Sequence, residues 1–134
     1  MTVSLVVADD DPDYRYFVRF LLGPLADTVT IVGEAGGGEE TLALVMHRRP
    51  DIVVADLLMP RLNGIELTRR IKQELPDTKI ILMTGYPGDA NRRLAYMGGA
   101  DGFLDKTALV TELLPAIRDI VGLGVPSGIR RVAC

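Results

Sequence analysis

Short runs of hydrophobic residues alternate along the chain with longer segments in which hydrophobic residues recur every three or four positions. The short runs are rich in β-branched residues and cover residues 3–7, 29–35, 51–55, 79–83 and 102–104. The longer segments cover residues 14–22, 39–47, 64–74, 89–97 and 108–121. A short β-branched run is typical of a strand, and a period of three to four residues is typical of an amphipathic helix. The pattern therefore predicts five strand–helix units in succession.

Five successive strand–helix units favour an α/β fold with a parallel sheet and helices on both of its faces. The first, third and fourth runs are hydrophobic at nearly every position, as expected of central strands that are buried on both sides. The run VTIVGEA at 29–35 is more polar and predicts an edge strand. With right-handed crossovers, these features predict a doubly wound, flavodoxin-like sheet of strand order 2-1-3-4-5. In such a sheet the ligand site lies at the carboxyl ends of the strands, between the first and the third.

The length of 134 residues fits one domain with a single continuous fold. We expect this domain to cover residues 1–122, with a tail or linker stub over 123–134, because glycine and proline end the last helical pattern there. The run GEAGGGEE at 33–40 is rich in glycine but lacks the Gly-Lys-Ser/Thr of a phosphate-binding loop, so it predicts a turn that leads into the second helix.

The composition is that of a soluble globular protein, with 48% hydrophobic and 25% charged residues. No hydrophobic run approaches the roughly 20 residues of a membrane span, and the first residues do not resemble a signal peptide. The single cysteine, Cys134, can form no internal disulfide bond, which agrees with a reducing compartment. We therefore expect a cytoplasmic protein without a membrane partner. The net charge of −3 lacks the basic excess of nucleic-acid binders, so direct nucleic-acid binding is not expected.

Three consecutive carboxylates follow the first predicted strand, in the sequence VVADDDPDYR. Two unit charges ~4 Å apart repel by about 4 kcal/mol at an effective dielectric constant near 20, so the cluster has to be solvated, protonated or neutralised by a cation. Asp11 precedes Pro12, which suits the first position of a helix, and we expect Asp11 to be the N-cap. Asp9 and Asp10 then remain for a site, together with Asp56 at the end of the third strand. A solvated acidic loop is the alternative.

The ends of the other strands add groups of complementary chemistry. Three carboxylates at one edge of a sheet make a site for a hard cation, and an open cluster with room for water and phosphate oxygens suits Mg²⁺. The fourth strand ends in LMTGY and the fifth in GFLDKT, which places the Thr84 hydroxyl and the Lys106 ammonium at the same edge. Carboxylates, a hydroxyl and a lysine form a set suited to phosphoryl transfer, in which one carboxylate is the nucleophile.

This arrangement resembles the response-regulator receiver domain of two-component signalling. The resemblance rests on Asp-Asp after the first strand, Asp-x-x-Met-Pro-x-x-x-Gly after the third, threonine after the fourth and lysine after the fifth. It covers about residues 3–122 in the expected order and spacing. The segment GFLDKTALVTELLPAI is similar to receivers whose relatives carry a helix-turn-helix output domain. The sequence does not reveal whether an effector domain follows in a longer chain.

The resemblance implies that Asp56 accepts a phosphoryl group from a partner, either a sensor histidine kinase or a phosphotransfer protein. Asp9 and Asp10 would hold Mg²⁺ together with the carboxylate of Asp56 and the backbone carbonyl of Leu58. Because three aspartates are adjacent, it remains open whether Asp10 and Asp11 take these two positions instead.

The resemblance also implies roles for the last two strand ends. Lys106 would pair with the phosphoryl oxygens, and Thr84 would hydrogen-bond to them once the acceptor is modified. Phe103 matches the aromatic switch residue of the family, which is expected to turn inward and change the surface formed by the fourth helix, the fifth strand and the fifth helix. Leu58 and Tyr86 are expected to line the approach of water to the phosphoryl group. A homodimer through the fourth and fifth helices would follow phosphorylation.

Several features leave alternatives open. Many receivers have a cis-proline after the lysine, but Thr107 follows Lys106 here, so the isomer of that bond is open. Pro115 is expected to kink the last helix or to delay its start. Met83 and Met97 are expected in the core.

Two competing functions are weighed against the switch. A phosphatase of the haloacid dehalogenase type would need a second aspartate where Leu58 stands, and its cap domain is missing. A receiver-like interaction module that is never phosphorylated remains an alternative to the switch. In neither the switch nor the module is the protein expected to be an enzyme with a separate substrate.

Overall fold

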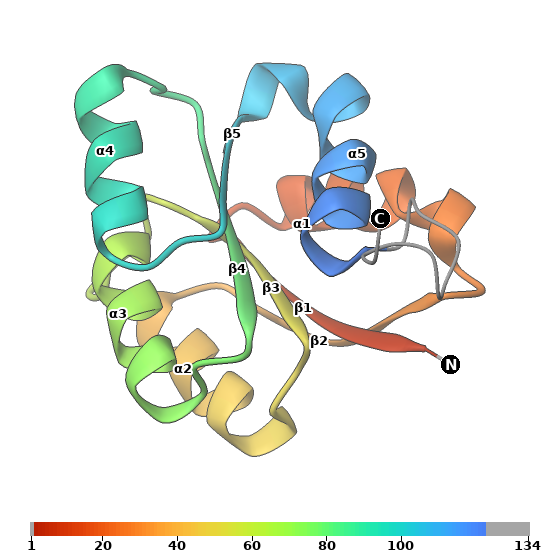
Figure 1. Cartoon of the computed structure of the whole chain (residues 1–134), viewed down its shortest axis with the longest axis horizontal. Helices are drawn as coiled ribbons and strands as arrows, with labels where there is room; N and C mark the ends of the chain where they lie inside the picture. Colours follow the sequence, from red (N-terminus) through yellow and green to blue (C-terminus); the bar gives the residue numbers. More distant parts are fainter. Residues whose placement is uncertain (1, 123–134) are drawn as a thin grey trace.

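The computed structural model describes residues 2–122 as a single alternation of strands and helices (Figure 1). The strands are β1 (Val3–Ala8), β2 (Val29–Ala35), β3 (Ile52–Asp56), β4 (Lys79–Thr84) and β5 (Gly102–Asp105). The helices are α1 (Pro12–Leu21), α2 (Gly38–Arg48), α3 (Gly64–Glu74), α4 (Asp89–Met97) and α5 (Leu109–Val121), with short 3₁₀ turns η1 (Gly23–Leu25) and η2 (Lys106–Ala108). Each predicted strand and helix is present, with bounds within two residues of those predicted. The predicted tail at 123–134, including Cys134, lies outside the described residues.

The five strands form one parallel sheet of order β2-β1-β3-β4-β5, as predicted. In Figure 1, α2, α3 and α4 cover one face of this sheet, while α1 and α5 cover the other. The polar strand β2 is an edge strand, also as predicted. The strand order reverses between β1 and β3, so the residues that follow these two neighbouring strands meet at one edge.

The central strands divide the hydrophobic core into two layers. Val6, Val53 and Ile80 point into the layer under α2, α3 and α4. Their neighbours Val7 and Val54 point into the layer under α1 and α5. Side chains of this size contribute roughly 1.5–3 kcal/mol each when fully buried, so hydrophobic residues at consecutive positions stabilise both layers. The two layers fix the strands that carry the acidic residues.

A bulge in the edge strand β2 was not predicted. Leu5 pairs with Ile31, whereas the next residue of β1, Val6, pairs with Gly33, so β2 contains one additional residue. An additional residue reverses the face on which the following side chains lie. A Cβ atom at Gly33 would lie 2.9 Å from the side chain of Leu44 in α2, so Gly33 faces α2. The next residue, Glu34, consequently faces α1.

Two of the open questions about the last strand and helix are answered by the backbone. The described residues contain no cis peptide bond, so the bond between Lys106 and Thr107 is trans. Helix α5 begins at Leu109, and Pro115 lies inside it, so the expectation that Pro115 delays the start of the helix is wrong. Across residues 2–122, no helix has both the length and the hydrophobicity needed to cross a membrane.

The expectation for the two methionines is half right. Met83 of β4 is fully buried, as predicted, whereas Met97 of α4 is 76% exposed. Helix α4 turns Ala95 toward the sheet. Met97 follows two positions later, which places it on roughly the opposite side of the helix. The prediction for Met97 failed because it considered the residue type and not the face of the helix on which the residue lies.

We expect Gly38→Ala to lower the free energy of unfolding by roughly 1–3 kcal/mol, because this part of α2 packs directly on the loop after β3. A Cβ atom at Gly38 would lie 2.0 Å from the backbone oxygen of Leu62. Gly37→Ala is a matched control, since its Cβ would meet only the flexible Glu40 side chain, at 3.4 Å. Urea unfolding of both variants tests this, and equal stabilities would contradict it.

Candidate functional site

Three carboxylates meet at the edge of the sheet where the strand order reverses. Asp9 and Asp10 follow β1 directly, and Asp56 is the last residue of β3. One carboxylate oxygen of each residue lies within 4.8 Å of the others. Asp9 and Asp56 are buried, whereas Asp10 is exposed, so the cluster has one side in the protein and one side in solvent.

Asp11 has a different task from its two neighbours. Its carboxylate accepts a hydrogen bond of 2.9 Å from the N–H of Asp13, and Pro12 is the first residue of α1. This is the N-cap that the sequence predicts. The N–H of Asp11 also donates to Asp9 Oδ1 at 2.9 Å, which orients the Asp9 carboxylate. The clustered pair is therefore Asp9 and Asp10, and the alternative pair of Asp10 and Asp11 is not the observed arrangement.

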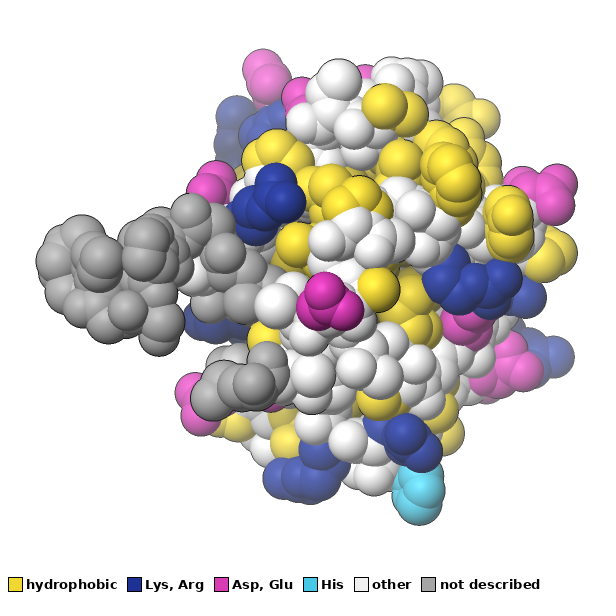
Figure 2. All heavy atoms as spheres, turned by 90° about the vertical axis from the view of Figure 1, so that its right-hand side faces the viewer, with side chains coloured by type: hydrophobic (Ala, Val, Ile, Leu, Met, Phe, Trp, Pro, Cys, Tyr) yellow, Lys and Arg dark blue, Asp and Glu magenta, His cyan; other side chains and the backbone are white. Residues whose placement is uncertain are grey.

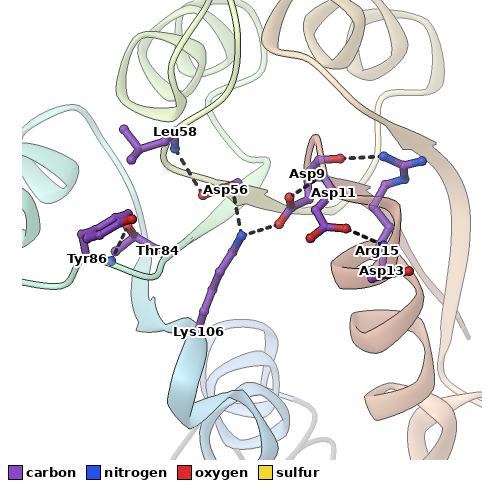
Figure 3. A network of polar contacts seen from close by, with 9 residues as sticks. All are labelled: Asp9, Asp11, Asp13, Arg15, Asp56, Leu58, Thr84, Tyr86 and Lys106. Atoms are coloured by element: carbon purple, nitrogen blue, oxygen red, sulfur yellow. Dashed lines mark hydrogen bonds and ion pairs between the residues drawn. The ribbon is translucent and has the colours of Figure 1, made fainter.

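Lys106 extends from the end of β5 between two of the carboxylates (Figure 3). Its Nζ donates to Asp56 Oδ2 at 3.0 Å and lies 2.7 Å from Asp9 Oδ2. The ring of Tyr14 packs against the same ammonium, with its centroid 4.0 Å from Nζ. Burial by itself lowers the pKa of Lys106, but the close polar contacts and charges of Asp9 and Asp56 outweigh this effect and raise the pKa. Lys106 is therefore a firmly charged cation in this site.

Asp9 is in a less favourable environment than Lys106. Burial raises the pKa of Asp9, and the charge of Asp56 acts in the same direction, while Lys106 and the N–H of Asp11 oppose them. Asp9 Oδ2 is buried and accepts no hydrogen bond among the described residues, since its contact with Lys106 is an ion pair without hydrogen-bond geometry. One ammonium faces three carboxylates, so the site keeps an excess of negative charge. These oxygen donors and the unsatisfied Asp9 Oδ2 fit a hard divalent cation such as Mg²⁺.

The loop after β3 depends on a glycine. The N–H of Gly64 donates to the carbonyl of Leu57 at 2.7 Å, and a Cβ atom at Gly64 would lie 2.8 Å from the backbone oxygen of Asp56. Asn63 caps α3 by accepting a hydrogen bond from the N–H of Glu66 at 2.9 Å. The glycine thus lets the loop return tightly over the end of the strand that carries Asp56.

Thr84 and Phe103 lie on the β4 and β5 side of the site. Thr84 is fully buried, and its Oγ1 accepts a hydrogen bond of 3.0 Å from the N–H of Tyr86, which leaves the hydroxyl proton as a separate donor. Phe103 is only 4% exposed, and the guanidinium of Arg92 lies over its ring at 5.1 Å from the centroid. The ring of Phe103 is thus buried in this structure, and its expected turn inward on phosphorylation stays a prediction.

A cavity of about 310 Å³ lies over Asp56. Its other lining residues are Tyr14, Leu58, Thr84, Gly85, Tyr86 and Lys106. The N–H of Leu58 donates to Asp56 Oδ1 at 3.2 Å, while the side chains of Leu58 and Tyr86 are largely exposed at the cavity rim. Leu58 and Tyr86 therefore flank the Asp56 carboxylate, and their expected effect on the approach of water stays a prediction.

Two residues of this region were missed by sequence reasoning. The ring of Tyr14 contacts Lys106, and Nη1 of Arg15 donates to the backbone oxygen of Asp9 at 2.6 Å. Both follow the predicted N-cap Asp11 by three or four positions. Side chains at that spacing lie on the same face of a helix and lean toward its N-terminus. The spacing of three and four residues from Asp11 was therefore the signal in the sequence that could have predicted both contacts.

Comparison with known proteins gives consistent results. The family described as the response regulator receiver domain matches residues 5–118. The transcriptional regulatory protein YxjL of Bacillus subtilis (strain 168) is 36% identical over 116 residues, which are 87% of this chain and 53% of YxjL. The chain spans about half the length of the curated relatives it matches. Because this relative is named a transcriptional regulatory protein, the expectation that nucleic acid is not a partner is not supported.

Solved structures agree with the fold. The signal receiver domain of the response regulator NarL from Mycobacterium tuberculosis is 31% identical with a TM-score of 0.83, and the match covers 90% of this chain and 97% of that one. A LuxR-family two-component response regulator from Aurantimonas sp. SI85-9A1 is 34% identical with a TM-score of 0.85, over 91% of this chain and 86% of that one.

We expect Asp9→Asn to raise the free energy of unfolding of the metal-free protein by roughly 0.5–2 kcal/mol at pH 7. The pKa of Asp9 is raised by folding, so this group favours the folded state below the ordinary carboxyl pKa of 3.8, and the contribution is lost as the pH rises through the raised value. The advantage of the amide should therefore shrink as the pH falls toward 3.8.

Urea unfolding in the presence of a chelator at several pH values measures this effect. Asp10→Asn is the control, because Asp10 is exposed and its neutralisation should stabilise the protein less. A destabilised Asp9→Asn protein at pH 7, or a gain that does not change with pH, would contradict the interpretation.

Proposed function

The chain belongs to the family of response regulator receiver domains, and on this basis we propose that it is a phosphorylation switch in which Asp56 accepts a phosphoryl group from a phosphohistidine of a partner protein. The partner is a sensor histidine kinase or a phosphotransfer protein. The observation that carries the proposal is the meeting of Asp56 with Lys106 and two further carboxylates, at a place where Asp56 and Lys106 line one open cavity. Receiver domains are signalling domains, so no separate substrate is proposed.

The transfer step forms one bond and breaks another. A carboxylate oxygen of Asp56 attacks the phosphorus, the bond between phosphorus and the imidazole nitrogen breaks, and the electron pair stays on that nitrogen. The product is an acyl phosphate on Asp56 and a histidine free of phosphate. Displacement of this kind is accelerated by positioning the reactants and by cationic groups that compensate charge on the phosphoryl oxygens.

The residues around Asp56 would divide these tasks. Asp9, Asp10 and Asp56 would hold Mg²⁺ with the backbone carbonyl of Leu58, and the metal would compensate charge on the phosphoryl oxygens. Lys106, which now bridges Asp9 and Asp56, would turn its ammonium to a phosphoryl oxygen.

Thr84 and the surface of α4 would transmit the change. The hydroxyl of Thr84 would donate a hydrogen bond to the phosphoryl group. Met97, Tyr96 and Leu94 expose hydrophobic surface on α4, which supports a phosphorylation-dependent homodimer through α4 and α5. Figure 2 views the α1 and α5 side of the molecule, where hydrophobic side chains also reach the surface between charged ones.

The proposal is tested by the intact mass of the protein after incubation with acetyl phosphate and Mg²⁺. We expect the wild-type protein to gain one phosphoryl group, with acetate as the leaving group, and Asp56→Asn to gain none. A chelator should abolish the gain because the excess negative charge of the site would then repel the donor. Circular dichroism is used to check that the wild-type protein and Asp56→Asn are both folded. No gain in the folded wild-type protein would contradict the switch and favour an interaction module.

We expect Tyr86→Ala and Leu58→Ala to accelerate loss of the phosphoryl group by threefold or more, because these side chains shield Asp56 from water at the cavity rim. A threefold change corresponds to ~0.7 kcal/mol in the barrier. Phe20→Ala is a matched control, since it removes a similarly exposed side chain from α1, outside the cavity. The decay is followed by mass after removal of the donor, and equal rates in all three variants would argue against shielding.

A further inference from the structure

Arg15 reaches the acidic turn from the first part of α1. Its Nη1 donates to the backbone oxygen of Asp9 at 2.6 Å, and its Nε donates to Glu34 Oε1 at 3.3 Å. The side chain is only 22% exposed. Figure 3 shows the guanidinium beside the Asp9 carbonyl, on the side of the turn away from Lys106. Arg15 thus connects the acidic turn to β2.

The carbonyl that Arg15 binds belongs to the peptide between Asp9 and Asp10. A peptide unit is planar, so holding its oxygen orients the whole unit and restricts the directions from which both neighbouring side chains leave the backbone. The N–H of Asp9 is held separately, by the carbonyl of Ala35 at 3.0 Å. Both backbone groups of Asp9 are therefore connected to β2. The N–H is held directly, and the carbonyl is held through Arg15 and Glu34.

The bulge in β2 makes this connection geometrically feasible. If β2 continued from Ile31 without a bulge, regular alternation of side chains would place Glu34 on the face of the sheet that α2 covers. With the bulge, Glu34 faces α1 and pairs with both Arg15 and Arg19. Bulges next to functional sites commonly redirect a side chain in this way. The irregularity in β2 thus directly precedes Glu34, the residue that pairs with Arg15.

We propose that Arg15, oriented by Glu34, is a positioning residue that fixes the peptide between Asp9 and Asp10 and thereby sets the Mg²⁺ affinity of the site. The inference rests on the proposed function, because the metal belongs to it. The charge of Arg15 would by itself repel a cation, and Glu34, which also pairs with Arg19, compensates only part of it. What Arg15 contributes is orientation, and hydrogen-bonded partners that orient metal ligands typically change metal affinity by about 10–100-fold.

The test compares Arg15→Gln with Arg19→Gln in the full-length chain. Both substitutions remove one positive charge that pairs with Glu34, so they change the electrostatic environment similarly. Only Arg15 also contacts the backbone oxygen of Asp9. Titration calorimetry with magnesium chloride should give a dissociation constant about tenfold or more higher for Arg15→Gln. The constant of Arg19→Gln should stay within about twofold of the wild-type value.

Two further readouts separate positioning from general stability. In metal-free protein, the NMR amide signal of Asp10, which shares its peptide with the Asp9 carbonyl, should shift in Arg15→Gln and not in Arg19→Gln. Arg15→Lys can still donate to that carbonyl and should recover part of the affinity. Thermal unfolding in the presence of a chelator is used to check that each variant is folded.

The outcomes distinguish this inference from the function on which it rests. A wild-type protein that binds no Mg²⁺ would overturn both. Binding by the wild-type protein with equal constants for Arg15→Gln and Arg19→Gln would overturn only the role of Arg15. An unchanged Asp10 signal in Arg15→Gln would do the same, because the peptide would then be held without the guanidinium.

Discussion

The rest of the site depends on the repulsion between two buried carboxylates, Asp9 and Asp56, which the fold forces to lie side by side. Lys106 compensates part of this repulsion, and Asp10 adds a further negative charge on the solvent side. Burial strengthens every charge interaction in the site because it removes solvent screening. Beside this excess of negative charge, one buried carboxylate oxygen of Asp9 has an ion pair with Lys106 but no hydrogen bond. A site of this kind is completed by a cation, and its charge balance changes when a phosphoryl group is added.

The fold produces this proximity through strand order more than through local sequence. Asp9 and Asp56 are far apart in the chain, yet β1 and β3 are neighbours and end at the same edge. The hydrophobic layers on both sides of the sheet hold these strands rigidly, so the carboxylates cannot separate. The glycine at position 64 lets the loop after β3 pack against the backbone of Asp56. Charge repulsion is thus offset by packing elsewhere in the domain.

The sequence was sufficient for the features that depend on periodicity and on strand ends. Each strand and helix and the N-cap at Asp11 follow from patterns within the chain, and the strand order follows from these patterns together with the resemblance to receiver domains. The bulge before Glu34 could not be predicted, because it arises from pairing with β1 and from the packing of Gly33 on α2. The pairing of Arg15 with Glu34 depends on that bulge and was missed for the same reason, whereas the spacing of Arg15 from Asp11 was a signal that could have predicted its contact with the Asp9 carbonyl. Met97 was misplaced because its residue type outweighed its position on the helix.

A chain of direct contacts leads from the site to α4, the helix that the proposed switch would move. Thr84 Oγ1 accepts a hydrogen bond from the N–H of Tyr86, and the carbonyl of Tyr86 accepts one from Asn91 of α4 at 3.0 Å. If the hydroxyl of Thr84 turns to a phosphoryl oxygen, the hydrogen bond from the N–H of Tyr86 to Thr84 Oγ1 would break or change direction. The carbonyl of Tyr86, which binds Asn91, would then shift as well. Arg92, one residue further along α4, already covers the buried ring of Phe103. Arg92 thus connects Phe103 to α4, so repacking at Phe103 would involve α4 in the proposed switch.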